Sequence, residues 1–131
     1  HALDGEQVMA IAADDAGASP EARLDAVISA IFGCYCGADA EHKVQINHLS
    51  QLPPEQKEEL KALERQLVKT LAGIVRAVRP GIHEALVRPV TMSLFGILNW
   101  KYMWFRANGT LTETEYSALV TRMALAAIKA A

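Results

Sequence analysis

Two cysteines and two histidines are the residues of this chain best suited to metal binding or nucleophilic chemistry. Cys34 and Cys36 are separated by one residue, and His42 and His48 follow them. Thiolates and imidazoles bind zinc, and a thiolate beside an imidazole can act as a nucleophile. Residues two apart on a helix point in nearly opposite directions, however, and residues six apart do not share a face. We therefore predict no metal site and no catalytic thiol here, and interpret the cysteines as small buried or half-buried side chains at a helix end.

Other patterns of catalysis are missing from the sequence. It contains no glycine-rich phosphate loop and no Glu-x-x-His motif of the kind that holds iron in helix bundles. The formal net charge of −2 provides no basic face for direct binding of nucleic acid. No apolar run approaches the roughly 18 residues of a membrane span, and the C-x-C spacing does not suit a disulfide. We expect a cytoplasmic protein that is not an enzyme and holds no cofactor.

A second group of polar residues lies within apolar stretches, where a binding cavity would place the groups that orient a ligand. The segment 94–106 contains both tryptophans and two of the three phenylalanines, with Asn99 one helical turn beyond Phe95. A buried carboxamide needs hydrogen-bond partners, so we expect Asn99 to bond to a neighbouring helix, a second subunit or a ligand. Trp100 and Trp104 share a face, which favours packing in a core or an interface.

Four basic residues lie near the ends of the long helix that contains this segment: His83, Arg88, Lys101 and Arg106. A ligand that carries a phosphate, such as a CoA thioester, needs such a group at the mouth of its pocket. Each cation is also compatible with a solvated charge or with a partner for the carboxyl end of a helix.

Hydrophobic spacing predicts an all-α chain of about six helices in one domain that covers residues 1–131. The predicted helices cover residues 2–15, 20–36, 39–52, 54–79, 89–107 and 113–129. The strongest periodicity is an apolar seam from Leu60 to Val78, opposite a face of Glu, Lys, Gln and Arg. Residues 82–87 are expected to form a separate short turn, because Pro89 is best tolerated in the first turn of the next helix.

Local signals mark where these helices start and stop. Ser19-Pro20 supplies a hydroxyl cap and a proline at the first helical position. Residues 112–115, Thr-Glu-Thr-Glu, form a capping box for the last helix. Asn108-Gly109 is expected to stop the preceding helix in a left-handed conformation.

Two parts of the sequence resemble the C-terminal regulatory domain of the tetracycline-repressor (TetR) family, in its acyl-CoA- and lipid-responsive branches. One is the set 88–92, 94–100, 104–106 and 108–109 with the capping box, and the other is Leu-Pro-Pro-Glu at 52–55 before a long charged helix. The resemblance implies an effector-sensing domain of a transcriptional repressor. Its last two long helices would form a four-helix interface in a homodimer, and its earlier helices would enclose a pocket for an effector that releases DNA.

The chain departs from this family in lacking the basic N-terminal helix-turn-helix. Residues 2–15 match the connecting helix that normally follows that domain, and the chain begins at His1 without a methionine. We therefore expect a piece of a longer regulator, which contacts DNA only through the missing domain and makes no contact with a membrane. A ligand-free helical dimerisation or interaction module is the first alternative function, and a metal protein or thiol enzyme that uses Cys34, Cys36 and His48 is the second.

The resemblance divides the candidate residues into a ligand-binding set and a dimer-interface set. The ligand, a small apolar molecule such as an acyl-CoA, a fatty acid or an aromatic compound, is expected to contact Phe32, Tyr35, Asn47, His48, Leu67, Leu71, Phe95, Asn99, Tyr102 and Met103. The second subunit is expected to contact Leu94, Ile97, Trp100, Trp104, Tyr116, Val120, Met123 and Ala127.

Overall fold

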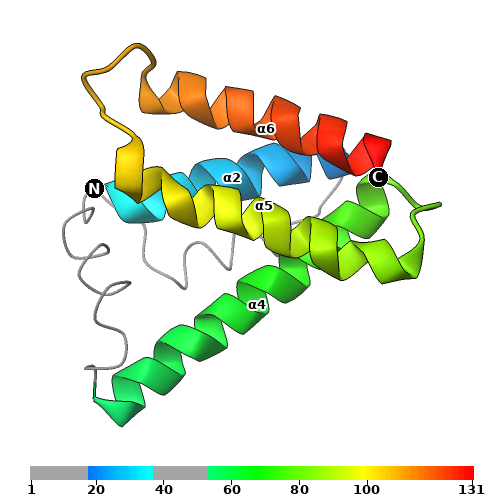
Figure 1. The fold of residues 1–131 in the computed structure, drawn as a ribbon, viewed down its shortest axis with the longest axis horizontal. Helices are drawn as coiled ribbons and strands as arrows, with labels where there is room; N and C mark the ends of the chain where they lie inside the picture. The colour runs from blue at the N-terminus through cyan, green and yellow to red at the C-terminus, as the bar shows by residue number, and fades with distance from the viewer. Residues whose placement is uncertain (1–17, 37–52) are drawn as a thin grey trace.

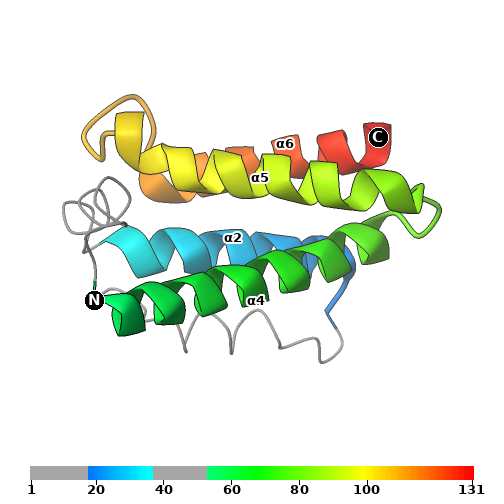
Figure 2. The same ribbon diagram turned by 60° about the horizontal axis from the view of Figure 1, so that its bottom comes forward.

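The computed structural model describes residues 18–36 and 53–131, which form four helices. They are α2 (Pro20–Cys36), α4 (Pro54–Val78), α5 (Glu84–Trp104) and α6 (Glu113–Ala130) (Figure 1). Figure 2 shows α5 and α6 lying above α2 and α4. The closest packing joins α2 to α6 and α4 to α5. The all-α prediction is confirmed for this part of the chain, and the helices expected at 2–15 and 39–52 lie outside the described residues.

The core is one apolar cluster to which all four helices contribute. Leu24 and Ile28 of α2, Ile74 of α4, Leu98 of α5 and Ile128 of α6 are almost fully buried in it. The predicted seam of α4 points into this cluster, since Leu67 and Leu71 are buried while Leu63 and Val78 are partly buried against it. Packing of an apolar helix face is therefore what fixes α4, as its periodicity indicates.

Side-chain caps start α2 and α6 as predicted. The Ser19 hydroxyl accepts a hydrogen bond from the Ala22 amide at 3.1 Å. In the capping box, the Thr112 hydroxyl accepts from the Glu115 amide at 3.1 Å, and the Glu115 carboxylate accepts from the Thr112 amide at 2.9 Å. Each cap satisfies amides that the first helical turn leaves without carbonyl partners.

The start of α5 differs from the prediction, because residues 84–87 belong to this helix and Pro89 lies inside it. His83 is the N-cap residue, and its ring nitrogen Nδ1 accepts from the Ala85 amide at 3.1 Å. Pro89 is only the sixth helical residue, so its missing amide removes one hydrogen bond close to an end that His83 already caps. The tight connection from α4, in which the Ile82 amide donates to the Arg79 carbonyl at 3.0 Å, brings the chain directly to this start.

The end of α5 also differs from the prediction. The helix ends at Trp104, and Phe105 is extended, with φ −70° and ψ 136°. The backbone of Gly109 is not left-handed, but a Cβ there would lie 3.1 Å from the Arg106 carbonyl oxygen. The aromatic ring of Phe105 stacks on Tyr116 of α6 with their centroids 5.1 Å apart. This contact across the hairpin, which local sequence signals do not encode, accounts for the earlier stop.

Candidate ligand-binding groove

A groove of about 720 Å³ runs between α4 and α5. This volume falls within the range of about 300–1,000 Å³ that is usual for small-ligand sites. The two helices are joined by a tight turn at one end and separate toward the start of α4 (Figure 1). Apolar side chains of both helices form the floor of the groove, namely Val68, Ala72, Val87, Met92 and Phe95.

Charged side chains form the walls, and cations outnumber acids. Five basic residues line the groove against two acidic ones: Lys61, Arg65, Lys69, Arg76 and Arg88 against Glu64 and Glu84. An apolar floor between predominantly basic walls suits a molecule that has an apolar body and a negative charge.

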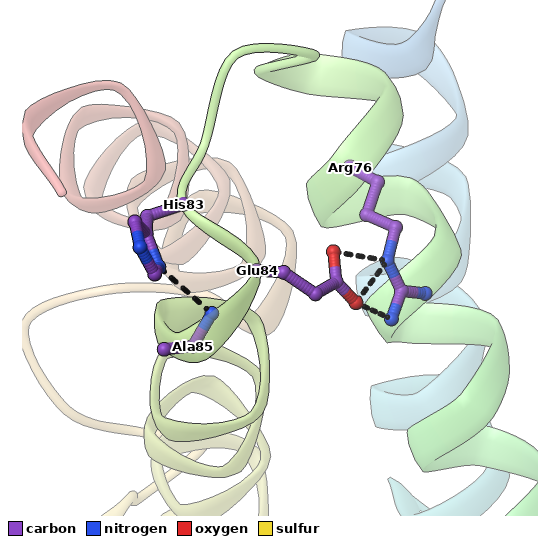
Figure 3. A network of polar contacts seen from close by, with 4 residues as sticks. All are labelled: Arg76, His83, Glu84 and Ala85. Carbon is purple, nitrogen blue, oxygen red and sulfur yellow. Dashed lines mark hydrogen bonds and ion pairs between the residues drawn. The ribbon is translucent and has the colours of Figure 1, made fainter.

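One ion pair joins two of these groove residues and lies at the joined end of the groove. The guanidinium of Arg76 donates to the Glu84 carboxylate at 2.6, 3.2 and 3.3 Å (Figure 3). The hydrogen bond from Arg76 lowers the pKa of Glu84, and the same bond raises the pKa of Arg76. Both side chains are well exposed, so the pair orients two charges more than it stabilises the fold.

Glu64, on the α4 wall, is the second acid of the groove. Burial raises the pKa of its carboxyl group from the usual 4.5, and the charge of nearby Lys61 opposes that rise. Glu64 is half-buried, so the α4 wall is partly removed from water at this position.

The sequence suggested that Lys101 lies at a pocket mouth or in solvent. The structure shows instead that this lysine is buried. Its side chain is only 1% exposed, and its ammonium group lies 2.8 Å from the Glu113 carboxylate. The ammonium also lies 4.7 Å from the ring centroid of Phe32 and 5.1 Å from that of Phe105. The Lys101–Glu113 pair therefore holds the end of α5 to the start of α6 inside an aromatic cluster.

Most of the predicted ligand-binding residues do not line the groove. Phe95 does, whereas Phe32, Leu67, Leu71 and Tyr102 are buried in the protomer, Asn99 is half-buried and Met103 is exposed. Asn47, His48 and the side chain of Tyr35 lie outside the described residues. Whether these residues contact a ligand stays a prediction.

The predicted dimer residues divide into a buried and an exposed group. Leu94, Tyr116 and Val120 point into the protomer core, so they have almost no surface to offer a second subunit. Trp100 and Trp104 are 61% and 51% exposed, Met123 and Ala127 are also exposed, and Ile97 is partly buried. On α5, the position of each residue around the helix explains this division. Leu94 lies on the same side as the buried Leu98, and Trp100 lies on the same side as the exposed Met92 and Met103.

Reasoning from the sequence missed most of the groove, and the signal it overlooked is on α4. Lys61, Arg65 and Lys69 recur at intervals of four, which places three cations along one face of the helix. The row belongs to a helix face that also carries Glu and Gln, and a mixed polar face of this kind is typical of a solvated surface.

Two negative findings apply to the part of the chain that the structure describes. There, no group of three or more His, Cys, Asp or Glu side chains is placed to hold a metal ion. None of the four described helices is long and apolar enough to cross a membrane.

Comparison with known proteins identifies the class of this domain. Residues 17–128 match the family model for the tetracyclin repressor-like C-terminal domain. The chain therefore belongs to this family, the C-terminal domains of TetR-type transcriptional regulators, which are not enzymes and which generally bind a ligand and form homodimers. No match was found among curated proteins.

Solved structures support the same fold. The chain is similar to a TetR-family transcriptional regulator from Bordetella parapertussis (24% identity, TM-score 0.75), covering 92% of this chain and 62% of that one. It is similar to a TetR/AcrR-family transcriptional regulator from Thermobifida fusca (24% identity, TM-score 0.70), covering 92% of this chain and 63% of that one. It is also similar to a tetR-family regulatory protein from Rhodococcus RHA1 (19% identity, TM-score 0.74), covering 95% of this chain and 67% of that one. The chain thus spans roughly two thirds of the length of these regulators.

Proposed function

We propose that this chain is the effector-sensing and dimerisation domain of a cytoplasmic TetR-like transcriptional repressor. A small ligand with an apolar acyl, CoA-type or aromatic body would bind it and release the parent protein from DNA. The observation that carries this proposal is that α5 takes part in two surfaces at once. One side of the helix forms a wall of the groove, and a neighbouring side carries exposed apolar residues, with Met92 belonging to both.

The exposed apolar residues support homodimerisation. Met92, Trp100, Met103 and Trp104 on α5 and Met123 on α6 are all 40% exposed or more. Large exposed apolar side chains are typical of interaction sites, and tryptophan is among the residues that contribute most to binding energy in interfaces. A symmetric dimer uses the same patch on both subunits, so one such surface suffices.

The mechanism we propose is a shift between two arrangements of α4 and α5. A ligand in the groove contacts both helices, so it binds more tightly to the arrangement in which they are correctly spaced. Only this difference in affinity can move the equilibrium. Because α5 also carries the exposed apolar residues, a change in its position would alter the geometry of the dimer, and with it the spacing of the DNA-binding domains of the parent.

Sedimentation velocity at micromolar concentration tests the dimer. The unmodified chain is expected to sediment as a dimer and Trp100→Glu as a monomer, because the substitution places a charge in the expected interface. Gln66→Glu, which adds the same charge at an exposed position of α4 away from the groove, should remain dimeric. A monomeric unmodified chain would contradict the proposal.

Thermal unfolding with a panel of fatty acids, acyl-CoAs and aromatic acids tests effector binding. A ligand at 100 times its dissociation constant adds about 2.7 kcal/mol to the free energy of unfolding, which corresponds to roughly 10 °C in Tm for a domain of this size. If the dimer is intact and no compound changes Tm, the chain is a ligand-free dimerisation module instead.

A further inference from the structure

We infer that the groove between α4 and α5 binds an amphipathic anion, with the acidic group held by Arg88 and Lys69 and the apolar body lying over Val68, Met92 and Phe95. This inference rests on the proposed function, since it takes that molecule to be the effector. Of the apolar ligands proposed above, it retains those that carry a negative charge and excludes those that are neutral.

The register of the two helices places these residues along the groove. Arg76 of α4 is paired with Glu84 of α5 at the joined end. Moving away from this pair, residue numbers fall along α4 and rise along α5 (Figure 1). With residues four apart one turn away on each helix, Arg88 lies at the level of Ala72, and Met92 at the level of Val68. Lys69 lies between these two levels on the α4 wall. The charged end of the groove is therefore followed directly by its apolar floor.

The charges of the groove are not balanced. Arg76 forms an ion pair with Glu84, and the positive charge of Lys61 favours the ionised form of the Glu64 carboxyl group. Within residues 18–36 and 53–131, no carboxylate lies within ion-pair distance of Arg65, Lys69 or Arg88. Three cations thus line an apolar groove without an acidic partner in the described part of the protein. A carboxylate or phosphate on the ligand would supply that partner, and a guanidinium binds such groups through paired hydrogen bonds.

Glu84 gives the site a second property. Its carboxylate lies at the joined end, one turn from Arg88 and in contact with Arg76, so it repels an incoming acid and occupies a guanidinium that the acid would otherwise use. Removing this charge frees Arg76 for the ligand. Glu84 therefore limits the affinity of the groove for anions and has no such effect on neutral molecules.

Isothermal titration of the full chain with decanoate tests the inference, with decan-1-ol as the neutral analogue and acetate as the head group without a tail. Decanoate is expected to bind, decan-1-ol at least tenfold more weakly, and acetate undetectably. Arg88→Gln should weaken decanoate binding by about tenfold, in line with the loss of one charged hydrogen bond, without changing the binding of decan-1-ol. Arg122→Gln, an exposed arginine on α6 outside the groove, is the matched control and should bind as the unmodified chain does.

Glu84→Gln distinguishes a binding site from general damage, because it should strengthen decanoate binding severalfold and a damaged protein cannot gain affinity. Higher salt should weaken binding in every variant that retains Arg88. Equal binding of decanoate and decan-1-ol, or no effect of Arg88→Gln, would overturn the inference. If decanoate fails to bind while the dimer forms and a neutral apolar compound such as decan-1-ol raises Tm, only this inference fails. If no compound binds, the proposed effector function fails with it.

Discussion

The ion pair of Lys101 and Glu113 allows a prediction in which two substitutions at one contact have unequal costs. Lys101 is 1% exposed and Glu113 is 28% exposed at the side chain, and their charged groups lie 2.8 Å apart. The ammonium is enclosed by the rings of Phe32, Tyr102 and Phe105, at 4.7, 5.3 and 5.1 Å from their centroids. The lysine therefore has no route to water, whereas the glutamate has one.

The expected magnitudes follow from this asymmetry. Glu113→Gln leaves a buried ammonium without its counter-charge, and breaking a buried pair in this way costs about 3–5 kcal/mol. The three rings retain part of the attraction to the cation, so we expect the lower end, about 3 kcal/mol. Lys101→Met removes the buried charge, fills the space with a flexible side chain that contacts aromatic rings favourably, and leaves a carboxylate that water can reach. We expect it to cost less than about 1 kcal/mol.

Thermal and urea unfolding of both variants and of the double variant measure these costs. For a domain of this size, 1 kcal/mol corresponds to roughly 3–5 °C in Tm. Glu113→Gln should lower Tm by about 10 °C, and Lys101→Met by less than about 4 °C. The double variant should match Lys101→Met, because no buried charge remains. Glu59→Gln, at an exposed acid of α4, is the control, and all measurements need one protein concentration because dimerisation also contributes to stability. A larger loss for Lys101→Met than for Glu113→Gln would refute the reasoning.

Two further predictions concern stability. Thr112→Ala removes the hydroxyl of the capping box and should lower the free energy of unfolding by about 1 kcal/mol, whereas Thr114→Ala, in the same turn, should have little effect; equal losses would contradict the cap. Burial raises the pKa of Glu64 above 4.5 in the folded chain, so the stability linked to its protonated form is present below about pH 4.5 and is lost as the pH rises through the folded pKa. Glu64→Gln should therefore equal the unmodified chain in Tm at pH 4 and exceed it at pH 7, and a constant difference would exclude this linkage.

Features encoded by neighbouring residues could be predicted from the sequence. The capping box at 112–115 satisfies its own amides, and the apolar period of α4 encodes the face that packs. The same locality explains the errors in α5. Rules for proline and glycine placed the start of α5 at Pro89 and its stop at Asn108-Gly109. The cap by His83 and the stacking of Phe105 on Tyr116 decided both ends instead.

The groove was less predictable because it depends on the relation between two helices. The charges on α4 have the same sequence pattern whether they face water or α5. For Lys101 the sequence led to the opposite error, in which a buried cation is predicted to be exposed. A lysine near a helix end is usually solvated, but this one is covered by Phe32 of α2 and paired with Glu113 of α6. Which cations are exposed, buried or paired is set by contacts between distant segments, which periodicity does not report.

Met92 has a consequence for how any ligand of this domain should be measured. Its side chain lines the groove and also lies among the exposed apolar residues of α5. A ligand and a second subunit would thus touch the same residue, and thermodynamic linkage requires each to change the affinity for the other by the same factor. The apparent dissociation constant of the ligand should then vary with protein concentration across the dimerisation range. Titrations at nanomolar and at micromolar protein would yield two different affinities, and their ratio is the coupling between the two events.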